Sequence, residues 1–169
     1  MRTMAAEQQA AATAAVQAVI YRAALLLDAE KFADWLALCA PDFTYRIQTY
    51  SPEIRKLMTW LQHDLKGLRT MIEMLPRHNT DHGQLSRHVS VYAVELEDGG
   101  TAATAISSFL CHRTMLDGIN AHLDSGETQL FLVGKYYDRF RLNGGQPLFI
   151  DRTVFLDTRR LDKGSHYPI

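Results

Sequence analysis

Four long segments rich in Val, Thr, Phe, Tyr and Ile fill the second half of the chain, and they restrict the possible folds more than any other feature. They are residues 86–97, 101–116, 128–142 and 148–160. Between them stand Asp98-Gly99-Gly100, Asp124-Ser125-Gly126 and Asn143-Gly144-Gly145. Asp, Asn and Gly adopt the positive φ values that tight chain reversals require. We therefore predict four consecutive strands, with strong hairpin signals at the first and last connections and a longer middle one.

Residues 4–40 have the composition and spacing of helices. From Met4 to Glu30 the sequence is rich in Ala, Gln and Leu, and apolar residues recur at helical intervals. A second helix is expected to follow, with Phe32 and Trp35 on one face. Pro41 should end it, because proline interrupts a helix. The two helices are expected to pack as a hairpin.

The region between these helices and the four strands has a mixed pattern. Residues 43–50 alternate large apolar and polar side chains, which predicts a strand with one buried face. Residues 53–75 are expected to be helical, and Gly67 leaves open whether they form one helix or two. Residues 76–84 have the composition of a surface loop. Helices followed by hairpin strands are typical of an α+β fold, with the helices on one face of an antiparallel sheet.

The chain is long enough for one domain, and its sheet is expected to need two covers. A length of 169 residues with 47% hydrophobic content predicts a single domain over residues 1–169. The expected third hairpin strand is apolar on both sides: Leu130, Leu132 and Tyr136 on one face, and Phe131, Val133 and Tyr137 on the other. The helices can cover one face only. The other face is expected to fold over itself or to meet another chain.

Charge and cysteine content exclude several classes of protein. Eighteen basic and nineteen acidic residues give a net charge of −1, so no general attraction to nucleic acid or anionic lipid is expected. The first residues look too polar for a secretory signal, and no later window approaches membrane-spanning length, which predicts a cytoplasmic protein. Cys39 and Cys111 form no CxxC or CxH pair, so we expect buried, hydrophobic cysteines.

Four stretches together resemble the β subunits of aromatic-ring-hydroxylating dioxygenases. They are FTYRI (43–47), LSRHV (85–89), VGKYYDRF (133–140) and RTVFLD (152–157). Each motif is short, so the specificity comes from their order and spacing, and the likeness runs from about Val16 to Leu161. The segments 50–56 and 164–169 are similar to the small subunit of a relative that acts on an alkyl sulfonate.

The resemblance implies a fold, partners and cofactors. The fold would be the cone-shaped, NTF2-like (cystatin-like) α+β fold, with N-terminal helices packed on a strongly curved antiparallel sheet. The chain would be the structural β subunit of a Rieske non-haem iron oxygenase, forming a trimer within an α3β3 hexamer. Each α subunit would carry a [2Fe-2S] Rieske cluster and a mononuclear Fe(II).

The residues of this chain agree with a cofactor-free subunit. A Rieske cluster needs two Cys and two His ligands. Cys39 is followed by Ala40 and Pro41, and Cys111 by His112, so the chain has no paired C-x-H elements. We therefore expect no cofactor and no metal in this chain and assign it no catalytic residue in the favoured interpretation.

One cluster, His78-Asn79-Thr80-Asp81-His82, has the spacing of metal ligands. On a helix, the two histidines would share a face. Because the segment follows Pro76 and is flanked by Gly83, we expect a solvated or interface loop rather than a metal site.

The main alternative is a cofactor-free dehydratase or isomerase of the same fold. Such an enzyme would use His88 as a general base inside the cone, together with Asp138 or a tyrosine. His88 shares its expected strand face with Tyr92, Val94 and Leu96, which is compatible with burial. A hydrogen-bonded core histidine is the commoner outcome. A third interpretation is a ligand-binding or transport-factor-like module that dimerises through its sheet.

Several aromatic and basic residues are candidates for a subunit interface. Asp and Arg residues on adjacent strands are expected to pair across strands, and those left unpaired could reach another subunit. The last four residues, 166–169, which we call the tail, are apolar enough that we expect them to dock on a neighbouring subunit. The candidates are Tyr50, Trp60, Arg87, Tyr137, Arg139, Arg152, Arg159, Arg160, His166 and Tyr167.

Overall fold

The computed structural model describes residues 2–78, 83–116, 125–159 and 167–169. Its elements are α1 (Arg2–Asp28), α2 (Phe32–Leu36), β1 (Cys39–Ser51), β2 (Lys56–Asp64), α3 (Leu65–His78), β3 (Gln84–Glu97), η1 (Asp98–Gly100), β4 (Ala102–Thr114), β5 (Thr128–Arg141) and β6 (Leu148–Leu156). The six strands form one sheet in the order β2-β1-β6-β5-β4-β3. All neighbours are antiparallel except β1 and β6, which run parallel. The predicted α+β fold is confirmed.

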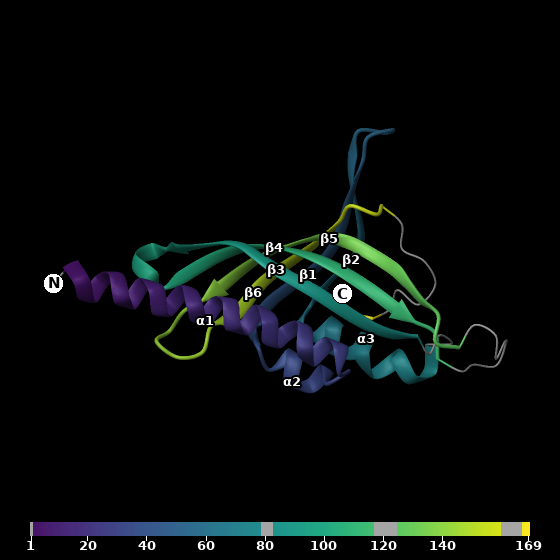
Figure 1. The fold of residues 1–169 in the computed structure, drawn as a ribbon, viewed down its shortest axis with the longest axis horizontal. Coiled ribbons are helices and arrows are strands. Elements are labelled where there is room, and N and C mark those ends of the chain that lie inside the picture. Colours follow the sequence, from purple (N-terminus) through teal and green to yellow (C-terminus); the bar gives the residue numbers. More distant parts are fainter. Residues whose placement is uncertain (1, 79–82, 117–124, 160–166) are drawn as a thin grey trace.

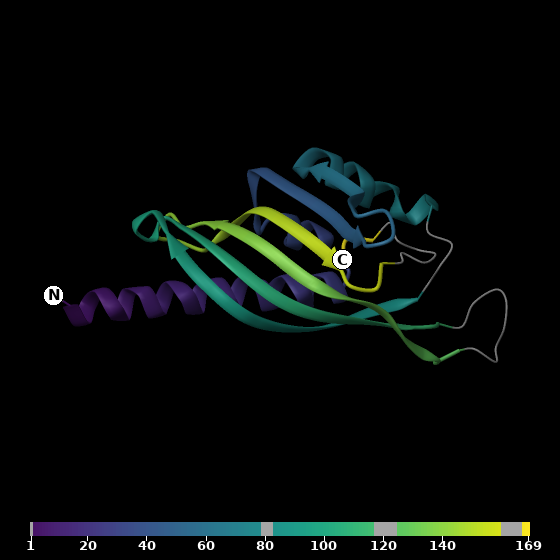
Figure 2. The ribbon, with the colours of Figure 1, turned by 90° about the horizontal axis from the view of Figure 1, so that it is seen from above.

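The three helices lie on one side of a curved sheet (Figure 1). Helix α1 packs along β3, whereas α3 packs against β1 and β2. Seen from above, α1 and α3 lie at opposite edges of the sheet (Figure 2). The β1–β2 hairpin rises away from the other strands (Figure 1). The helices therefore close one face of the sheet and leave its other face uncovered.

The core lies between the helices and the inner face of the sheet. Strand β1 shows why it forms there: Phe43, Tyr45 and Ile47 are buried, and the residues between them are only half-buried. The large side chains of the core are Trp35, Phe43, Tyr45, Phe109, Tyr136, Phe140 and Phe149, each no more than 1% exposed. Aromatic rings thus fill most of the space inside the curved sheet.

The prediction that residues 53–75 are helical is wrong in its first half. Residues 56–64 form β2, and the helix begins only at Leu65. The apolar residues Leu57, Trp60 and Leu61 fit helical spacing, but pairing with β1 satisfies the backbone of this segment as a strand. A tight turn at Arg55, where φ is 52°, sends the chain back along β1. Tertiary pairing has overridden the local pattern.

Two predicted helix ends also differ. Helix α2 ends at Leu36, so Pro41 lies within β1 rather than after a helix that reaches residue 40. Pro76, expected in a loop, lies near the end of α3, which continues to His78. Both corrections move a boundary by a few residues and leave the order of these elements unchanged.

The alanine-rich helix α1 corrects the expectation that no window is long and apolar enough to span a membrane. Residues Ala6–Asp28 meet that condition by length and composition. A helix of a protein core passes the same test. In this structure the buried side of α1, including Val16, Ile20 and Ala23, joins the core, and the helix packs along β3.

Candidate functional site

A buried ion pair lies inside the cone. Asp138 of β5 faces Arg152 of β6 across the strand register, so both side chains point to the inner face. The guanidinium donates two hydrogen bonds of 2.8 Å, from Nε to Oδ1 and from Nη2 to Oδ2. The two side chains are 0% and 2% exposed. The predicted cross-strand pairing is thus found, but inside the subunit, where both oxygens of Asp138 accept hydrogen bonds from Arg152.

Aromatic rings cover the Arg152 guanidinium. Its central carbon lies 4.3 Å from the ring centre of Tyr136 and 4.5 Å from that of Phe149. Tyr136 in turn stacks on Phe109 with ring centres 4.3 Å apart. Burial alone would lower the pKa of Arg152, but the Asp138 carboxylate outweighs burial and raises it. Arg152 therefore stays charged, and its charge is compensated within the core.

A second buried arginine, Arg87, joins three parts of the chain. Its Nη1 donates to Asp28 Oδ1 at 2.6 Å, at the end of α1. The backbone N–H of Arg87 donates to the same carboxylate at 2.9 Å. Its Nη2 donates to the carbonyl oxygen of Pro168 at 2.7 Å. Arg87 thereby ties α1 and β3 to the tail of the chain.

The tail lies in the chain's own core, which corrects the prediction that it docks on a neighbour. Ile169 is 0% exposed. Its N–H donates to the hydroxyl of Tyr45 at 2.8 Å, and that hydroxyl donates to the Ile169 carbonyl oxygen at 3.2 Å. Tyr167 is half-buried, whereas His166 lies outside the described residues. Pro168 and Ile169 therefore fill the cone that an enzyme of this fold would keep open for substrate.

His88 lies on the opposite face of the sheet, away from the cone. It is exposed, and its ring meets that of His112 edge to face at 5.3 Å. A bulge between Val91 and Ala93 shifts the register of β3, so residues before and after it that were expected to share a face do not. His88 points outward while Val94 packs against the core. The pairing of His88 with Asp138 in one catalytic site is therefore wrong.

The uncovered face of the sheet carries apolar side chains. Ile106, Leu110 and Tyr137 on β4 and β5 are 38%, 40% and 42% exposed. Arg139 lies beside Tyr137 in a depression of about 260 Å³ on this face. We call Ile106, Leu110, Tyr137 and Arg139 the outer face. Its apolar character agrees with the expectation that one side of the sheet needs a second cover.

The β1–β2 hairpin is a second apolar surface. Its exposed large side chains are Tyr50, Ile54, Leu57, Met58 and Trp60. Arg159, just after β6, donates to both oxygens of Glu53 at 2.7 and 2.8 Å, and Ser51 donates to the same carboxylate at 2.8 Å. The Arg159 contacts tie the tip of the projecting hairpin to the segment that follows β6.

Apart from the half-buried Tyr167, the interface candidates separate into three groups. Tyr50, Trp60, Tyr137, Arg139 and Arg159 lie on the surface. Arg87 and Arg152 are buried and paired inside the chain, so they have no surface to offer a partner. Arg160 and His166 lie outside the described residues.

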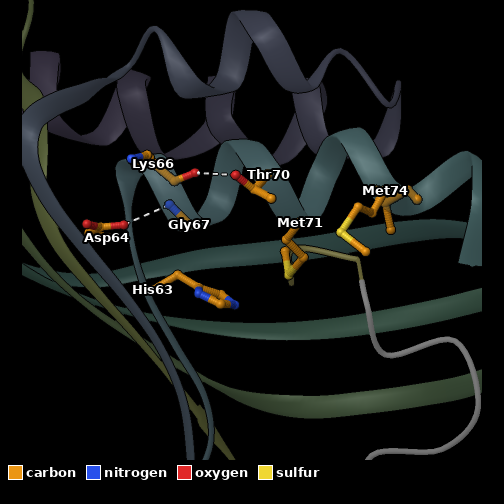
Figure 3. A pocket seen from close by; sticks show the side chains of 8 residues that line it. His63, Asp64, Lys66, Gly67, Thr70, Met71 and Met74 are labelled. Atoms are coloured by element: carbon orange, nitrogen blue, oxygen red, sulfur yellow. Dashed lines mark hydrogen bonds between the residues drawn. The ribbon is translucent and has the colours of Figure 1, made fainter.

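A pocket of about 620 Å³ opens where β2 meets α3 (Figure 3). Two hydrogen bonds join lining residues: the N–H of Gly67 donates to Asp64 Oδ1 at 2.7 Å, and Thr70 donates to the Lys66 carbonyl at 3.2 Å. The methionines Met71 and Met74 and Leu75 line its other side. His63 also lines it, and sequence reasoning missed this residue because its segment was expected to be helical.

The cysteines do not fit an iron–sulfur cluster. Both are free and buried, as predicted. Burial raises the pKa of Cys39 to about 12 and also raises the pKa of Cys111, whereas a metal ligand must be a thiolate. Within the described ranges, no group of three His, Cys, Asp or Glu residues could hold a metal ion. The predicted cluster from His78 to His82 lies largely outside these ranges.

Comparison with known sequences finds a match to the SnoaL-like domain over residues 8–153. The chain is 52% identical to the methanesulfonate monooxygenase hydroxylase β subunit of Methylosulfonomonas methylovora, over 92% of this chain and 86% of the relative. It is 31% identical to the 2-aminobenzenesulfonate 2,3-dioxygenase β subunit of Alcaligenes sp., over 93% and 99%. The resemblance to oxygenase β subunits, and to one that acts on an alkyl sulfonate, is confirmed.

Solved structures confirm the fold. The β subunit of an aromatic-ring-hydroxylating dioxygenase from Novosphingobium aromaticivorans superposes with a TM-score of 0.75 and 24% identity, over 95% of this chain and 99% of that one. An NTF2-like protein with a cystatin-like fold from the same organism gives a TM-score of 0.63 and 15% identity, over 100% and 97%. The expected NTF2-like cone is therefore correct.

Proposed function

Because the chain belongs to the SnoaL-like domain family and to the β subunits of multi-component oxygenases, we propose that it is the structural subunit of an oxygenase whose catalytic centre lies in a partner α subunit. Its role is to hold that partner in a defined assembly. In this proposal the chain provides contact surfaces for the assembly, and the partner carries out the oxidation.

The filled cone is the observation that supports a structural role most strongly. Pro168 and Ile169 occupy its interior, and aromatic side chains with almost no exposure surround them. Asp138 and Arg152, its charged pair, bind each other through two hydrogen bonds. A dehydratase or isomerase needs an open pocket with polar groups directed at the substrate. Among the described residues, this interior is filled by side chains and the Pro168–Ile169 segment, and His88 lies on the far face of the sheet.

The partner supplies the redox chemistry in this proposal. We assign a [2Fe-2S] Rieske cluster and a mononuclear Fe(II) to the α subunit, because the buried thiols of this chain are poor ligands. Both curated relatives are named for sulfonates, methanesulfonate and 2-aminobenzenesulfonate. The substrate of the complex is therefore an organic sulfonate, bound in the α subunit.

The two exposed apolar surfaces divide the contacts of the assembly. The outer face, with Tyr137 and Arg139, packs on a second copy of this chain and builds the β trimer of an α3β3 hexamer. The projecting hairpin, with Tyr50 and Trp60, contacts the α subunit. Large aromatic side chains and arginines dominate binding at such interfaces. We place the complex in the cytoplasm, since the apolar helix α1 is accounted for by its packing on β3.

Co-expression with the α subunit tests the proposal. A tagged copy of this chain should retain an iron-containing partner through size-exclusion chromatography, and light scattering should give the mass of three copies of each subunit. Tyr137→Lys should reduce the assembly to smaller species, whereas Leu25→Lys, at an exposed apolar position on α1, should not. A chain that stays monomeric and never retains an iron–sulfur protein would contradict the proposal.

A further inference from the structure

Pro168 and Ile169 are held inside the cone in the way that a protein holds a bound peptide. The carbonyl of Pro168 accepts a hydrogen bond of 2.7 Å from Arg87 Nη2. The hydroxyl of Tyr45 accepts from the Ile169 N–H at 2.8 Å and donates to its carbonyl at 3.2 Å. The two backbone carbonyls and the N–H between them thus meet two buried side chains that lie far away in the sequence.

The surrounding interior has more hydrogen-bond donors than this segment uses. Arg87 Nε, the Tyr136 hydroxyl and the Ser107 hydroxyl are buried without a hydrogen-bond partner among the described residues. Ser107 and Tyr136 face each other across β4 and β5 on the inner face. Burial raises the pKa of Tyr136 to about 12, although the charge of Arg87 opposes this, so the hydroxyl keeps its proton. The interior is therefore equipped to receive carbonyl oxygens.

The charges of the interior favour a neutral peptide over a free ion. Asp28 pairs with Arg87 at 2.6 Å, and Asp138 pairs with Arg152 at 2.8 Å. Each guanidinium is thus compensated before any ligand is counted. The side chain of Ile169 belongs to the apolar core cluster, so the interior also holds a space shaped for a branched aliphatic group.

We propose that the cone contains a peptide-binding site that the chain fills with its own Pro168–Ile169 segment, and that it accepts a Pro-Ile peptide from outside once this segment is removed. The inference goes beyond the structural role proposed above and does not depend on it. It explains why Arg87 and Tyr45 are buried in the interior: they bind and orient the Pro168–Ile169 segment.

The test uses a chain shortened after Tyr167 and two neutral probes, N-acetyl-Pro-Ile and N-acetyl-Pro-Gly, each with an amidated carboxyl end. The shortened chain should melt at a lower temperature than the full chain, and N-acetyl-Pro-Ile should raise that temperature and bind once per chain by calorimetry. N-acetyl-Pro-Gly, which lacks the aliphatic side chain, should bind more weakly. The full chain should bind neither peptide, because its site is occupied.

A matched variant distinguishes specific recognition of the peptide from nonspecific hydrophobic binding. Tyr45→Phe in the shortened chain removes the hydroxyl that binds both backbone groups of Ile169 and keeps the ring. It should weaken binding of N-acetyl-Pro-Ile about three- to tenfold, the effect of losing one or two hydrogen bonds. Equal binding with and without the hydroxyl would contradict the assignment.

If the shortened chain does not fold unaided, the yield of refolding from urea gives the same answer. N-acetyl-Pro-Ile should increase the yield of folded chain more than N-acetyl-Pro-Gly does. The proposal is overturned if neither stability nor refolding yield responds to the peptide, or if the full chain binds it equally well. Assembly with the α subunit is scored separately, so failure here leaves the structural role untouched.

Discussion

At the scale of single residues, the two buried arginines of this chain have their partners inside the subunit. Asp138 and Arg152 bind each other, and Arg87 binds Asp28 and the tail. Removing one partner of a buried ion pair leaves an uncompensated charge, which is far more destabilising than replacing both partners by apolar groups. These residues therefore specify the closed interior, and substitutions of them test that role.

Asp138→Asn should lower the free energy of unfolding by about 3–5 kcal/mol, because Arg152 would remain buried without its counter-charge. Urea unfolding monitored by fluorescence measures this loss. The double variant Asp138→Leu with Arg152→Met should recover much of it. Arg139→Met, at the exposed neighbouring position, serves as the control and should be close to neutral. Equal stability of Asp138→Asn and the wild-type chain would show that the pair carries no buried charge.

The pair of Glu53 and Arg159 should make stability depend on pH in acid. Hydrogen bonds from Arg159 lower the pKa of Glu53 from 4.5 to about 2. A carboxylate with a lowered pKa in the folded state stabilises the fold above its unfolded pKa, and the effect is lost as the pH falls through the folded pKa. The stability advantage of the wild-type chain over Glu53→Gln should therefore shrink between pH 4.5 and 2. Melting temperatures across this range measure it, and a constant difference would contradict the assignment.

At the scale of elements, the local sequence pattern predicted most strands, but it did not predict for every residue which side of the sheet its side chain points to. The glycine-rich connections defined the hairpins of β3 to β6, and positive φ at Gly99 and Gly144 shows why. The bulge in β3 has no signature in the sequence, so the outward direction of His88 could not be predicted. Strand β2 was missed because its apolar spacing fits a helix as well, and only pairing with β1 decides between them.

Gly134 in β5 shows how closely two strands approach. A Cβ at this position would collide with the backbone carbonyl of Phe155 and touch the ring of Phe109. Gly134→Ala should therefore lower the free energy of unfolding by about 1–3 kcal/mol, as overpacking does. Gly145→Ala, where a Cβ meets open space, is the matched control and should change little. Denaturant titration of the two variants compares them, and equal stabilities would contradict the close approach.

The hairpin should contribute to assembly rather than to folding. Trp60 is 46% exposed, so Trp60→Ala should leave the melting temperature of the isolated chain nearly unchanged. If the hairpin contacts the α subunit, the same substitution should weaken its binding by at least tenfold, since large aromatic residues often carry more than 1.4 kcal/mol at interfaces. Surface plasmon resonance measures this. Unchanged affinity would show that the α subunit contacts another surface of this chain.

At the scale of the whole molecule, the helices of the chain cover one face of its sheet, and the other face is left uncovered and available for contact with another subunit. Sequence reasoning predicted this two-faced sheet, the fold and the β-subunit family. It misplaced the tail, because the contact of Ile169 with Tyr45 joins residues 124 positions apart and depends on the finished cone. Burial of Arg87 and Arg152 escaped it for the same reason. The alternation of side chains along a strand tells which residues share a face of the sheet, but it does not tell which face becomes the interior.

The most direct test of a structural subunit is to measure iron and turnover in the separated subunits of the purified complex. The α subunit should retain all the iron. Oxygenase activity should remain with the α subunit or return when the two subunits are recombined. This chain alone should contain no iron and convert no small molecule. Iron bound at stoichiometric level in the isolated chain, or turnover without its partner, would contradict the account.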